Sequence, residues 1–384
     1  MNQLRAGFGL GGRIDRALSE KVDPSFPFGT DEYWMEQALL CAMNSVGLSP
    51  PNPSVGCVLV KNDEVLSTGF TQVTGREHAE RMAFLSLPEH SDLSGVTAYV
   101  TLEPCSHFGS QPPCADLFLN SGIKRVVVAC QDPDPRVNGE GISRLRANGI
   151  EVKIGVLEKE AQAFLFPFFF QRKMNRPAWI AKWAQTPKGY LADATGVSKW
   201  ITNPKSRAYT HWLRQKYDAI VIGAETYLKD HPSLTVRDSA MPHNRSPVPI
   251  LFDPKGRCLE FNVPSHFLHF VGKTALNSRL ASENTYLFPE GSGEDSIFEN
   301  FKNVVDQHPF QKPLQSVMVE GGPTLINGFL KANLFNAAHQ FTGVKEFSTE
   351  DDRYRTTWNP SGFWNYATSY YFDQDHLQEW WKGF

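Results

Sequence analysis

Features that would assign this chain to several other protein classes are scarce or missing. Six cysteines among 384 residues are too few for the disulfide framework of a small secreted domain. The most apolar run, at 164–170, is far shorter than the ~20 residues that cross a bilayer. The 38 basic and 41 acidic residues give a net charge of −3, which provides no global attraction to nucleic acid or membrane. We therefore expect a soluble cytoplasmic protein with neither nucleic acid nor membrane as a partner.

A secretory signal is also missing, because the first thirty residues contain no continuous apolar stretch. The glycines and arginines of this region predict a mobile tail over residues 1–29. A transit peptide is the alternative, and Asp15 and Glu20 count against it. The sequence contains no internal repeat, and its length predicts about two domains.

Three potential metal ligands, His78, Cys105 and Cys114, occur together with Glu80, two positions after the histidine. A catalytic zinc is typically held by three such ligands and leaves its fourth position to water. His-x-Glu followed by Pro-Cys and a second cysteine is the signature of zinc deaminases, in which the glutamate moves protons and does not bind the metal. We predict a catalytic zinc held by the histidine and the two cysteines, with Glu80 as the proton carrier.

The expected secondary structure favours this site. Helical patterns follow His78 and begin next to Cys114, so both residues are expected at helix N-termini. The partial positive charge there favours thiolate over thiol, and therefore metal binding. Bound zinc would lower the pKa of its water to roughly 7, and Glu80 would accept that proton. A purely structural metal is the alternative, and it requires a fourth protein ligand such as His107.

The spacing of the two cysteines bears on the substrate. Eight residues separate Cys105 from Cys114, whereas the deaminases of nucleosides and nucleic acids have two. With this loop, with Asn52 in the run 51–58 and with the loop 131–139, the sequence resembles the bifunctional riboflavin-biosynthesis diaminohydroxyphosphoribosylaminopyrimidine deaminase / 5-amino-6-(5-phosphoribosylamino)uracil reductase. The resemblance covers about residues 31–156. It implies a cytidine-deaminase-like domain, with Asn52 and the 131–139 loop near the substrate.

The order of expected elements also indicates an α/β domain. Thr30 is the predicted N-cap of a helix at 31–45, with acidic residues in its first turn. Strands that alternate with helices favour three layers. The predicted strands lie at 56–60, 65–69, 96–102, 124–130 and 151–156. The polar segment 171–177, which ends in proline, is the predicted linker.

The second half shows another alternation, with predicted strands at 178–185, 218–223, 248–253 and 316–320. Gly321 and Gly322 precede a helix, where backbone N–H groups approach phosphate, although the pair is not the Gly-x-Gly-x-x-Gly fingerprint. As an ordered set, residues 178–330 are similar to the reductase half of the same family. This resemblance implies a dihydrofolate-reductase-like fold and NADPH as cofactor.

The same resemblance assigns residues to each ligand. Those expected beside NADPH are Ala184, Trp200, Thr226, Asp230, Gly322, Pro323, Thr324, Leu325, Ile326 and Asn327. Those expected beside the substrate are Ser198, Arg214, Leu234, Arg237 and Glu320. The two arginines suit a sugar phosphate, because a guanidinium binds phosphate oxygens in bidentate fashion.

Two departures from the family pattern lie in this half. Lys188 stands where the family often has an acid in Ser-Leu-Asp-Gly. The tail from 350 to 384 is rich in aromatics, for which core packing of a final strand and helix, or a subunit interface, are the two interpretations.

We therefore predict an α/β enzyme with a zinc-dependent deaminase domain at 30–172 and an NADPH-dependent reductase domain at 178–384. The resemblance implies zinc-hydroxide deamination of 2,5-diamino-6-ribosylamino-4(3H)-pyrimidinone 5′-phosphate, followed by reduction of the ribosyl group to ribityl. A homo-oligomer is expected. The alternative is an enzyme with deaminase activity alone, whose C-terminal domain binds substrate or serves assembly.

Overall fold

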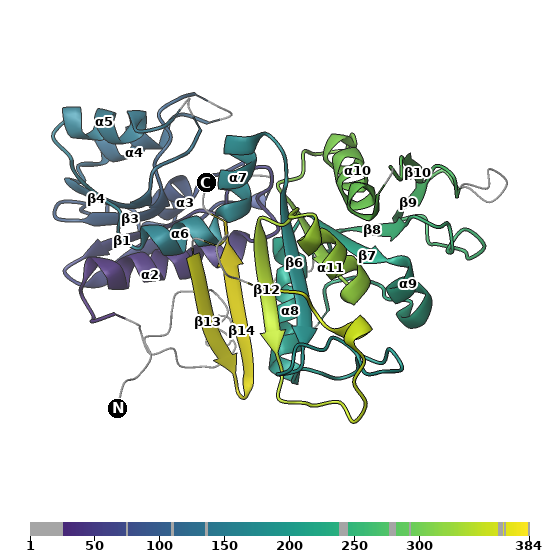
Figure 1. Ribbon diagram of the computed structural model, residues 1–384. Helices are drawn as coiled ribbons and strands as arrows, with labels where there is room; N and C mark the ends of the chain where they lie inside the picture. The colour runs from purple at the N-terminus through teal and green to yellow at the C-terminus, as the bar shows by residue number, and fades with distance from the viewer. Residues whose placement is uncertain are drawn as a thin grey trace. The chain divides into compact units, whose positions relative to one another are not determined.

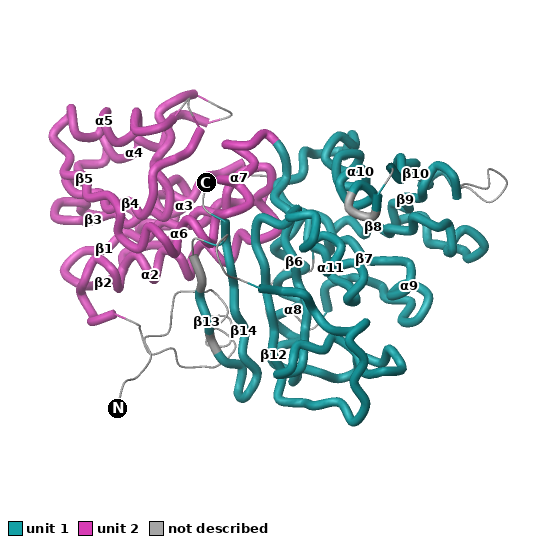
Figure 2. Tube along the Cα trace, viewed as in Figure 1, with its two compact units in different colours: residues 1–15, 176–240, 244–384 teal, residues 16–175, 241–243 magenta. Residues whose placement is uncertain are grey.

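The computed structural model describes residues 26–73, 76–108, 111–134, 137–237, 245–275, 282–291, 293–359, 364 and 366–382. The predicted tail at 1–29 lies outside these residues up to position 25. The chain forms two compact units, which divide between Asn175 and Arg176 (Figure 2).

The N-terminal unit contains a five-stranded sheet with the strand order β2-β1-β3-β4-β5 (Figure 1). β1 is antiparallel to β2 and β3, whereas β3, β4 and β5 are parallel. All five predicted strands are confirmed, with ends that differ by at most two residues. The elements are α2 (Asp31–Ala42), a 3₁₀ turn (Met43–Ser45), β1 (Gly56–Lys61), β2 (Glu64–Phe70), α3 (Ala79–Leu85), β3 (Thr97–Leu102), α4 (Cys114–Ser121), β4 (Arg125–Cys130), α5 (Glu140–Ala147), β5 (Glu151–Ile154), α6 (Glu158–Phe164) and α7 (Phe166–Met174). Helix α7 extends into the segment predicted as a linker.

Two glycines show that helices cover both faces of this sheet. Gly56 pairs with Phe70, so Gly56 and Gly69 face opposite sides, since side chains alternate along a strand. A Cβ atom at Gly56 would lie 2.0 Å from the Ala38 carbonyl oxygen of α2. A Cβ atom at Gly69 would lie 2.2 Å from the Ala79 carbonyl oxygen of α3. The two helices therefore pack closely on opposite faces, and the predicted three-layer α/β fold is confirmed.

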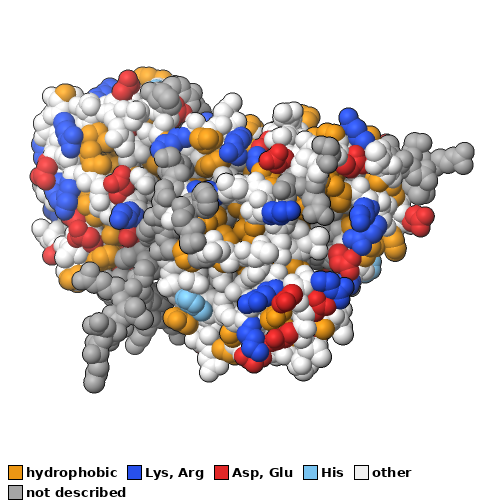
Figure 3. Space-filling view, in the orientation of Figure 1, with side chains coloured by type: hydrophobic (Ala, Val, Ile, Leu, Met, Phe, Trp, Pro, Cys, Tyr) orange, Lys and Arg blue, Asp and Glu red, His pale blue; other side chains and the backbone are white. Residues whose placement is uncertain are grey.

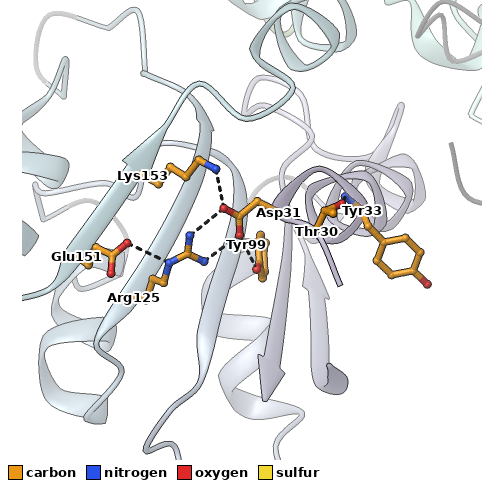
Figure 4. Close-up of polar contacts among 7 residues, drawn as sticks. All are labelled: Thr30, Asp31, Tyr33, Tyr99, Arg125, Glu151 and Lys153. Carbon is orange, nitrogen blue, oxygen red and sulfur yellow. Dashed lines mark hydrogen bonds and ion pairs between the residues drawn. The ribbon is translucent and has the colours of Figure 1, made fainter. Parts of the chain in front are cut away.

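The N-terminus of α2 is fixed to the sheet by charge (Figure 4). Thr30 is the N-cap, and its hydroxyl accepts a hydrogen bond from the Tyr33 N–H, as predicted. Asp31 accepts hydrogen bonds from both terminal nitrogens of Arg125, at 2.9 and 2.8 Å, and from Lys153 at 2.7 Å. The Tyr99 hydroxyl also donates to Asp31, at 2.9 Å. The hydrogen bonds from Arg125 have the largest effect on Asp31 and hold the pKa of its carboxyl group well below the usual range. Burial acts in the opposite direction but is outweighed.

The parallel strands β3 and β4 end together, which brings two loops to one edge of the sheet. Leu102 pairs with Cys130 in register, so the segment that leads to Cys105 and the loop that begins at Gln131 leave the sheet side by side. Ligands of α/β proteins typically bind at this carboxyl edge.

The C-terminal unit contains a nine-stranded sheet with the order β10-β9-β8-β7-β11-β6-β12-β14-β13. The strands are parallel except for β14, which is antiparallel to β12 and β13. The predicted strands β6, β7, β8 and β11 and the glycine-preceded helix α11 are confirmed. The elements are β6 (Ala178–Gln185), α8 (Pro204–Lys216), β7 (Ala219–Gly223), α9 (Ala224–Asp230), β8 (Val248–Asp253), β9 (Leu268–Gly272), β10 (Thr285–Phe288), α10 (Glu294–Gln307), β11 (Ser316–Glu320), α11 (Pro323–Lys331), β12 (Ala337–Thr342), a 3₁₀ turn (Asp352–Tyr354), β13 (Tyr366–Phe372) and β14 (Asp375–Trp381).

The aromatic tail packs on the core of its own unit. Trp358, Trp364 and Trp380 are partly buried against the cluster that contains Trp183, and the rings of Trp183 and Trp358 lie 5.3 Å apart. Core packing, the first of the two interpretations, is thus confirmed. The expected final helix is wrong for the described part of the tail, which forms the hairpin β13–β14 instead.

Positive and negative side chains are interspersed on the face seen in Figure 3, in keeping with the small net charge. None of the helices in the described segments is long and apolar enough to span a membrane.

Candidate active sites

His78, Cys105 and Cys114 come together in the N-terminal unit. Their three ligand atoms all lie within 4.8 Å of one another. The Nδ1 atom of His78 lies 3.3 Å from the Cys114 Sγ and 3.6 Å from the Cys105 Sγ. His107 is exposed and lies outside this cluster. The group therefore offers three ligands and not the four of a closed structural site.

Local structure explains why these atoms converge. His78 is the N-cap residue of α3, Cys114 is the first residue of α4, and Cys105 follows β3. The N–H of Cys114 donates to the Cys105 Sγ at 3.3 Å. A helix start thus supports the sulfur of the neighbouring loop, in agreement with the expectation from helix N-termini.

The electrostatics of the cluster suit a metal ion. A hydrogen bond from the Cys114 side chain, supported by His78, lowers the pKa of the Cys105 thiol and so favours its thiolate. One imidazole nitrogen and two cysteine sulfurs form a donor set that fits zinc with one open position. The four other cysteines are free thiols whose pKa is raised by burial, as expected for inert packing: Cys41, Cys57, Cys130 and Cys258.

Glu80 lies beside the cluster in a cavity of about 240 Å³. Its side chain is 3% exposed, and this burial, against the effect of His78, raises the pKa of Glu80 to about 7. Asn52 lines the same cavity, as the family resemblance implied. A buried carboxyl group with such a pKa both accepts and donates protons near neutral pH.

Several residues of this cavity were not identified individually from the sequence. Glu103 is buried and accepts hydrogen bonds from the backbone N–H groups of Asp132, Gly139, Gly141 and Ile142. It therefore fixes the loop that follows β4, and its place in Leu-Glu-Pro-Cys beside a metal ligand was the available signal. Asp132, Asp134, Gln111 and Arg172 also line the cavity.

A second cavity, of about 810 Å³, lies in the C-terminal unit at the carboxyl ends of β6, β7 and β11. It is lined by six of the ten residues expected beside NADPH: Ala184, Trp200, Thr226, Asp230, Gly322 and Pro323. It is also lined by all five residues of this unit expected beside the substrate: Ser198, Arg214, Leu234, Arg237 and Glu320.

The four remaining residues belong to α11 and do not line this cavity. The side chains of Leu325 and Ile326 are buried in the core, and Thr324 and Asn327 border a different hollow. The first N–H groups of a helix have no partner within that helix, so only the backbone of this segment is available to a phosphate in the cavity.

A largely buried ion triad borders the second cavity, and its lysine was not identified from the sequence. Lys182 and Glu320 pair in register on neighbouring strands, which places the Lys182 Nζ 3.0 Å from the carboxylate. The Nε of Arg214 donates to the same carboxylate at 3.1 Å. Burial acts to raise the pKa of Glu320, but the two cations outweigh it and lower the pKa to about 2.

Comparisons with known proteins identify a related domain in each of the two units. Residues 29–130 match the family model of the cytidine and deoxycytidylate deaminase zinc-binding region, and residues 177–343 match that of the RibD C-terminal domain. The chain is 39% identical to the riboflavin biosynthesis protein RibD of Aquifex aeolicus strain VF5, over 82% of this chain and 87% of that protein. It is 35% identical to RibD of Escherichia coli strain K12, over 79% and 85% of the two chains. The chain belongs to the RibD family.

Solved structures of the RibD family share the fold. A diaminohydroxyphosphoribosylaminopyrimidine deaminase/5-amino-6-(5-phosphoribosylamino)uracil reductase from Thermotoga maritima superposes with a TM-score of 0.73 at 33% identity, over 92% of this chain and 99% of that chain. RibD from Acinetobacter baumannii gives 0.72 at 29% identity, with the same coverage. This RibD-family member is a bifunctional deaminase and reductase of riboflavin biosynthesis, and its cofactors are zinc and NADPH.

The second cavity fits the NADPH that a RibD reductase domain uses. Its described lining holds six lysines and arginines against three acidic residues, a balance that suits several phosphate groups. The guanidinium of Arg207 lies 4.5 Å from the ring centroid of Trp200, which is 64% exposed and so presents a planar surface to a ligand.

Lys188, the departure from the RibD-family pattern, is outside the described lining of this cavity. Its Nζ lies 3.0 Å from the Glu350 carboxylate and 3.8 Å from that of Glu346. The lysine therefore links the turn after β6 to the first residue of the aromatic tail and to Glu346 just before it.

Proposed function

We propose that this enzyme removes the 2-amino group of 2,5-diamino-6-ribosylamino-4(3H)-pyrimidinone 5′-phosphate in a domain at 30–172. It then reduces the ribosyl group to ribityl with NADPH in a domain at 178–384. The Thermotoga maritima relative is a diaminohydroxyphosphoribosylaminopyrimidine deaminase/5-amino-6-(5-phosphoribosylamino)uracil reductase, which supports this substrate class. The observation that carries the proposal is the buried Glu80 in one cavity with a three-ligand metal site.

In the deaminase half, His78, Cys105 and Cys114 hold the zinc. When bound, zinc supplies the Lewis acidity that makes water nucleophilic near neutral pH. Glu80 accepts the two protons of that water in turn, and it passes one to the ring nitrogen and the other to the amino group, which leaves as ammonia. Its burial keeps the carboxyl group away from bulk water, and Asn52 holds the pyrimidine in place.

In the reductase half, NADPH supplies the hydride for C1′ of the ribosyl group. Ala184, Trp200, Thr226 and Asp230 border the cofactor, together with Gly322, Pro323 and the backbone of the first turn of α11. Ser198, Leu234 and Arg237 border the substrate, and Arg214 and Glu320 do so as a fixed ion pair. The triad with Lys182 keeps Arg214 in one orientation, because its partner carboxylate is itself held from two sides.

The enzyme is further proposed to act in the cytoplasm as a homo-oligomer. None of the six cysteines is in a disulfide, which supports a reducing compartment. Strand β13 is the last strand of the nine-stranded sheet, and edge strands are common sites of pairing between copies. Light scattering on the purified enzyme measures the oligomeric state. A monomer at micromolar concentration would contradict the proposed homo-oligomer.

A two-channel assay tests the main proposal. Zinc-loaded enzyme receives the diaminopyrimidine phosphate and NADPH, and ammonia and NADPH absorbance are followed separately. We expect ammonia release with an equal loss of NADPH. Ammonia release without loss of NADPH would contradict the proposed reductase activity. If zinc-loaded enzyme neither released ammonia nor consumed NADPH, the proposed substrate would be wrong.

A further inference from the structure

The deaminase cavity has an unusual charge for a site that receives a phosphorylated substrate. Its described lining includes four carboxylates, those of Glu80, Glu103, Asp132 and Asp134, but one lysine or arginine, which is Arg172. Like charges repel strongly where water is limited. A phosphate group that enters this cavity away from the proposed zinc therefore needs a cation, and Arg172 is the one lysine or arginine that the described lining offers.

Arg172 lies on α7, and the described residues provide it with no strong partner. Its guanidinium lies 5.2 Å from the ring centroid of Phe168, one turn earlier on the same helix. Its Nε is buried and has no hydrogen-bond partner among the described residues. The nearest carboxylate oxygen, of Asp134, is 3.9 Å away, which exceeds hydrogen-bond distance.

A buried donor without an acceptor destabilises a folded protein, so its persistence calls for an explanation. An anionic oxygen of the ligand would supply the missing acceptor. A guanidinium with 30% of its side chain exposed, fixed against an aromatic ring at the cavity wall, is ready to accept such a ligand. The competing explanation is that Arg172 only ties α7 to the loop of Asp134.

We propose that Arg172 binds the 5′-phosphate of the pyrimidine substrate in the deaminase cavity. This inference rests on the proposed function, because it takes the phosphoribosyl pyrimidine as the substrate. Arg172 thereby distinguishes the nucleotide from the corresponding nucleoside, and it takes no part in the proton transfers of Glu80.

The test compares two substrates in the full-length, zinc-loaded enzyme: the diaminopyrimidine ribosyl phosphate and the same compound after treatment with phosphatase. R172M keeps the aliphatic stem against Phe168 and removes the charge. We expect it to raise the KM for the phosphorylated substrate about 10- to 100-fold, with kcat for ammonia release little changed. The KM for the dephosphorylated substrate should equal that of wild type. K173M, at the exposed neighbouring position, is the matched control and should change neither value.

Each outcome separates the explanations. An equal loss on both substrates would assign Arg172 a structural role, and an unchanged KM would show that it does not contact phosphate; either result overturns the inference. One bound zinc per chain, measured by mass spectrometry, reports whether the N-terminal unit of R172M is folded. If it is not, R172K replaces it and should show a smaller rise in KM confined to the phosphorylated substrate. Wild-type enzyme that releases no ammonia from either substrate would overturn the proposed function itself.

Discussion

Replacement of Glu80 by glutamine should stop ammonia release without unfolding the protein. Glutamine has nearly the volume of glutamate and carries no charge, so at a position that is 3% exposed it leaves neither a cavity nor an unpaired buried charge. The exchange removes the one group that the proposed mechanism uses to take a proton from water and pass it to the substrate.

The expected fall in the rate of ammonia release follows from the two proposed roles of Glu80, as proton acceptor and as proton donor. A positioned acid–base group contributes about 10²- to 10⁴-fold to a rate. Because Glu80 serves both the attack of water and the departure of ammonia, we expect a fall in kcat of about 10³- to 10⁴-fold. This corresponds to about 4–5 kcal/mol of activation free energy.

Three measurements make the test specific. Ammonia is determined chemically, zinc by mass spectrometry, and reductase activity by NADPH oxidation with the deaminated product; we expect only the first to fall. E77Q is the matched control, since Glu77 lies outside the described cavity lining and is paired with Arg81 at 2.9 Å. An E80Q rate within tenfold of wild type would refute the role of Glu80, and a parallel loss of zinc would assign it to the metal site.

Three further outcomes are expected. C105S should bind less than one zinc per chain and lose ammonia release while it retains NADPH oxidation, because Cys105 is one of the three proposed metal ligands. D31N should lower the free energy of unfolding by about 1–3 kcal/mol at pH 7. Since the folded-state pKa of Asp31 is depressed, its stabilisation is present above pH ~4 and is lost as the pH falls, so urea unfolding of wild type and D31N should converge in acid. K188M should leave the NADPH oxidation rate within about twofold of wild type, because Lys188 lies outside the described cavity lining; a tenfold loss would contradict this.

The sequence was most informative where the relevant residues are close together in the chain. The alternation of strands and helices predicted both α/β units, and the motifs around His78 and Cys105 predicted which atoms converge in the N-terminal unit. Both patterns are local, since each depends on where a strand ends and the next helix begins. Thr30 was identified as an N-cap for the same reason.

Features that depend on strand register or on distant segments were not predicted. Lys182 and Glu320 are 138 residues apart, and only their pairing in register on β6 and β11 makes them an ion pair. Arg172 was assigned to a linker because its neighbours are polar, whereas α7 continues through it. In α11, the helix was predicted correctly, but which side chains turn into the core was not, since that depends on how the helix packs on the sheet.

The two cavities differ in charge in a way that agrees with the division of labour between the units. The second cavity has six basic and three acidic side chains in its described lining, which suits NADPH and a sugar phosphate at once. The first has one arginine and four carboxylates, and two of these carboxylates are engaged in holding the loop after β4: Glu103 through four backbone N–H groups and Asp132 through the N–H of Asp134. These contacts occupy two of the three carboxyl groups that remain beside Glu80, which makes room for the proposed zinc and phosphate in the same small cavity. The loop that Glu103 fixes is therefore as much a part of the deaminase site as the metal ligands, although it supplies no ligand to the metal.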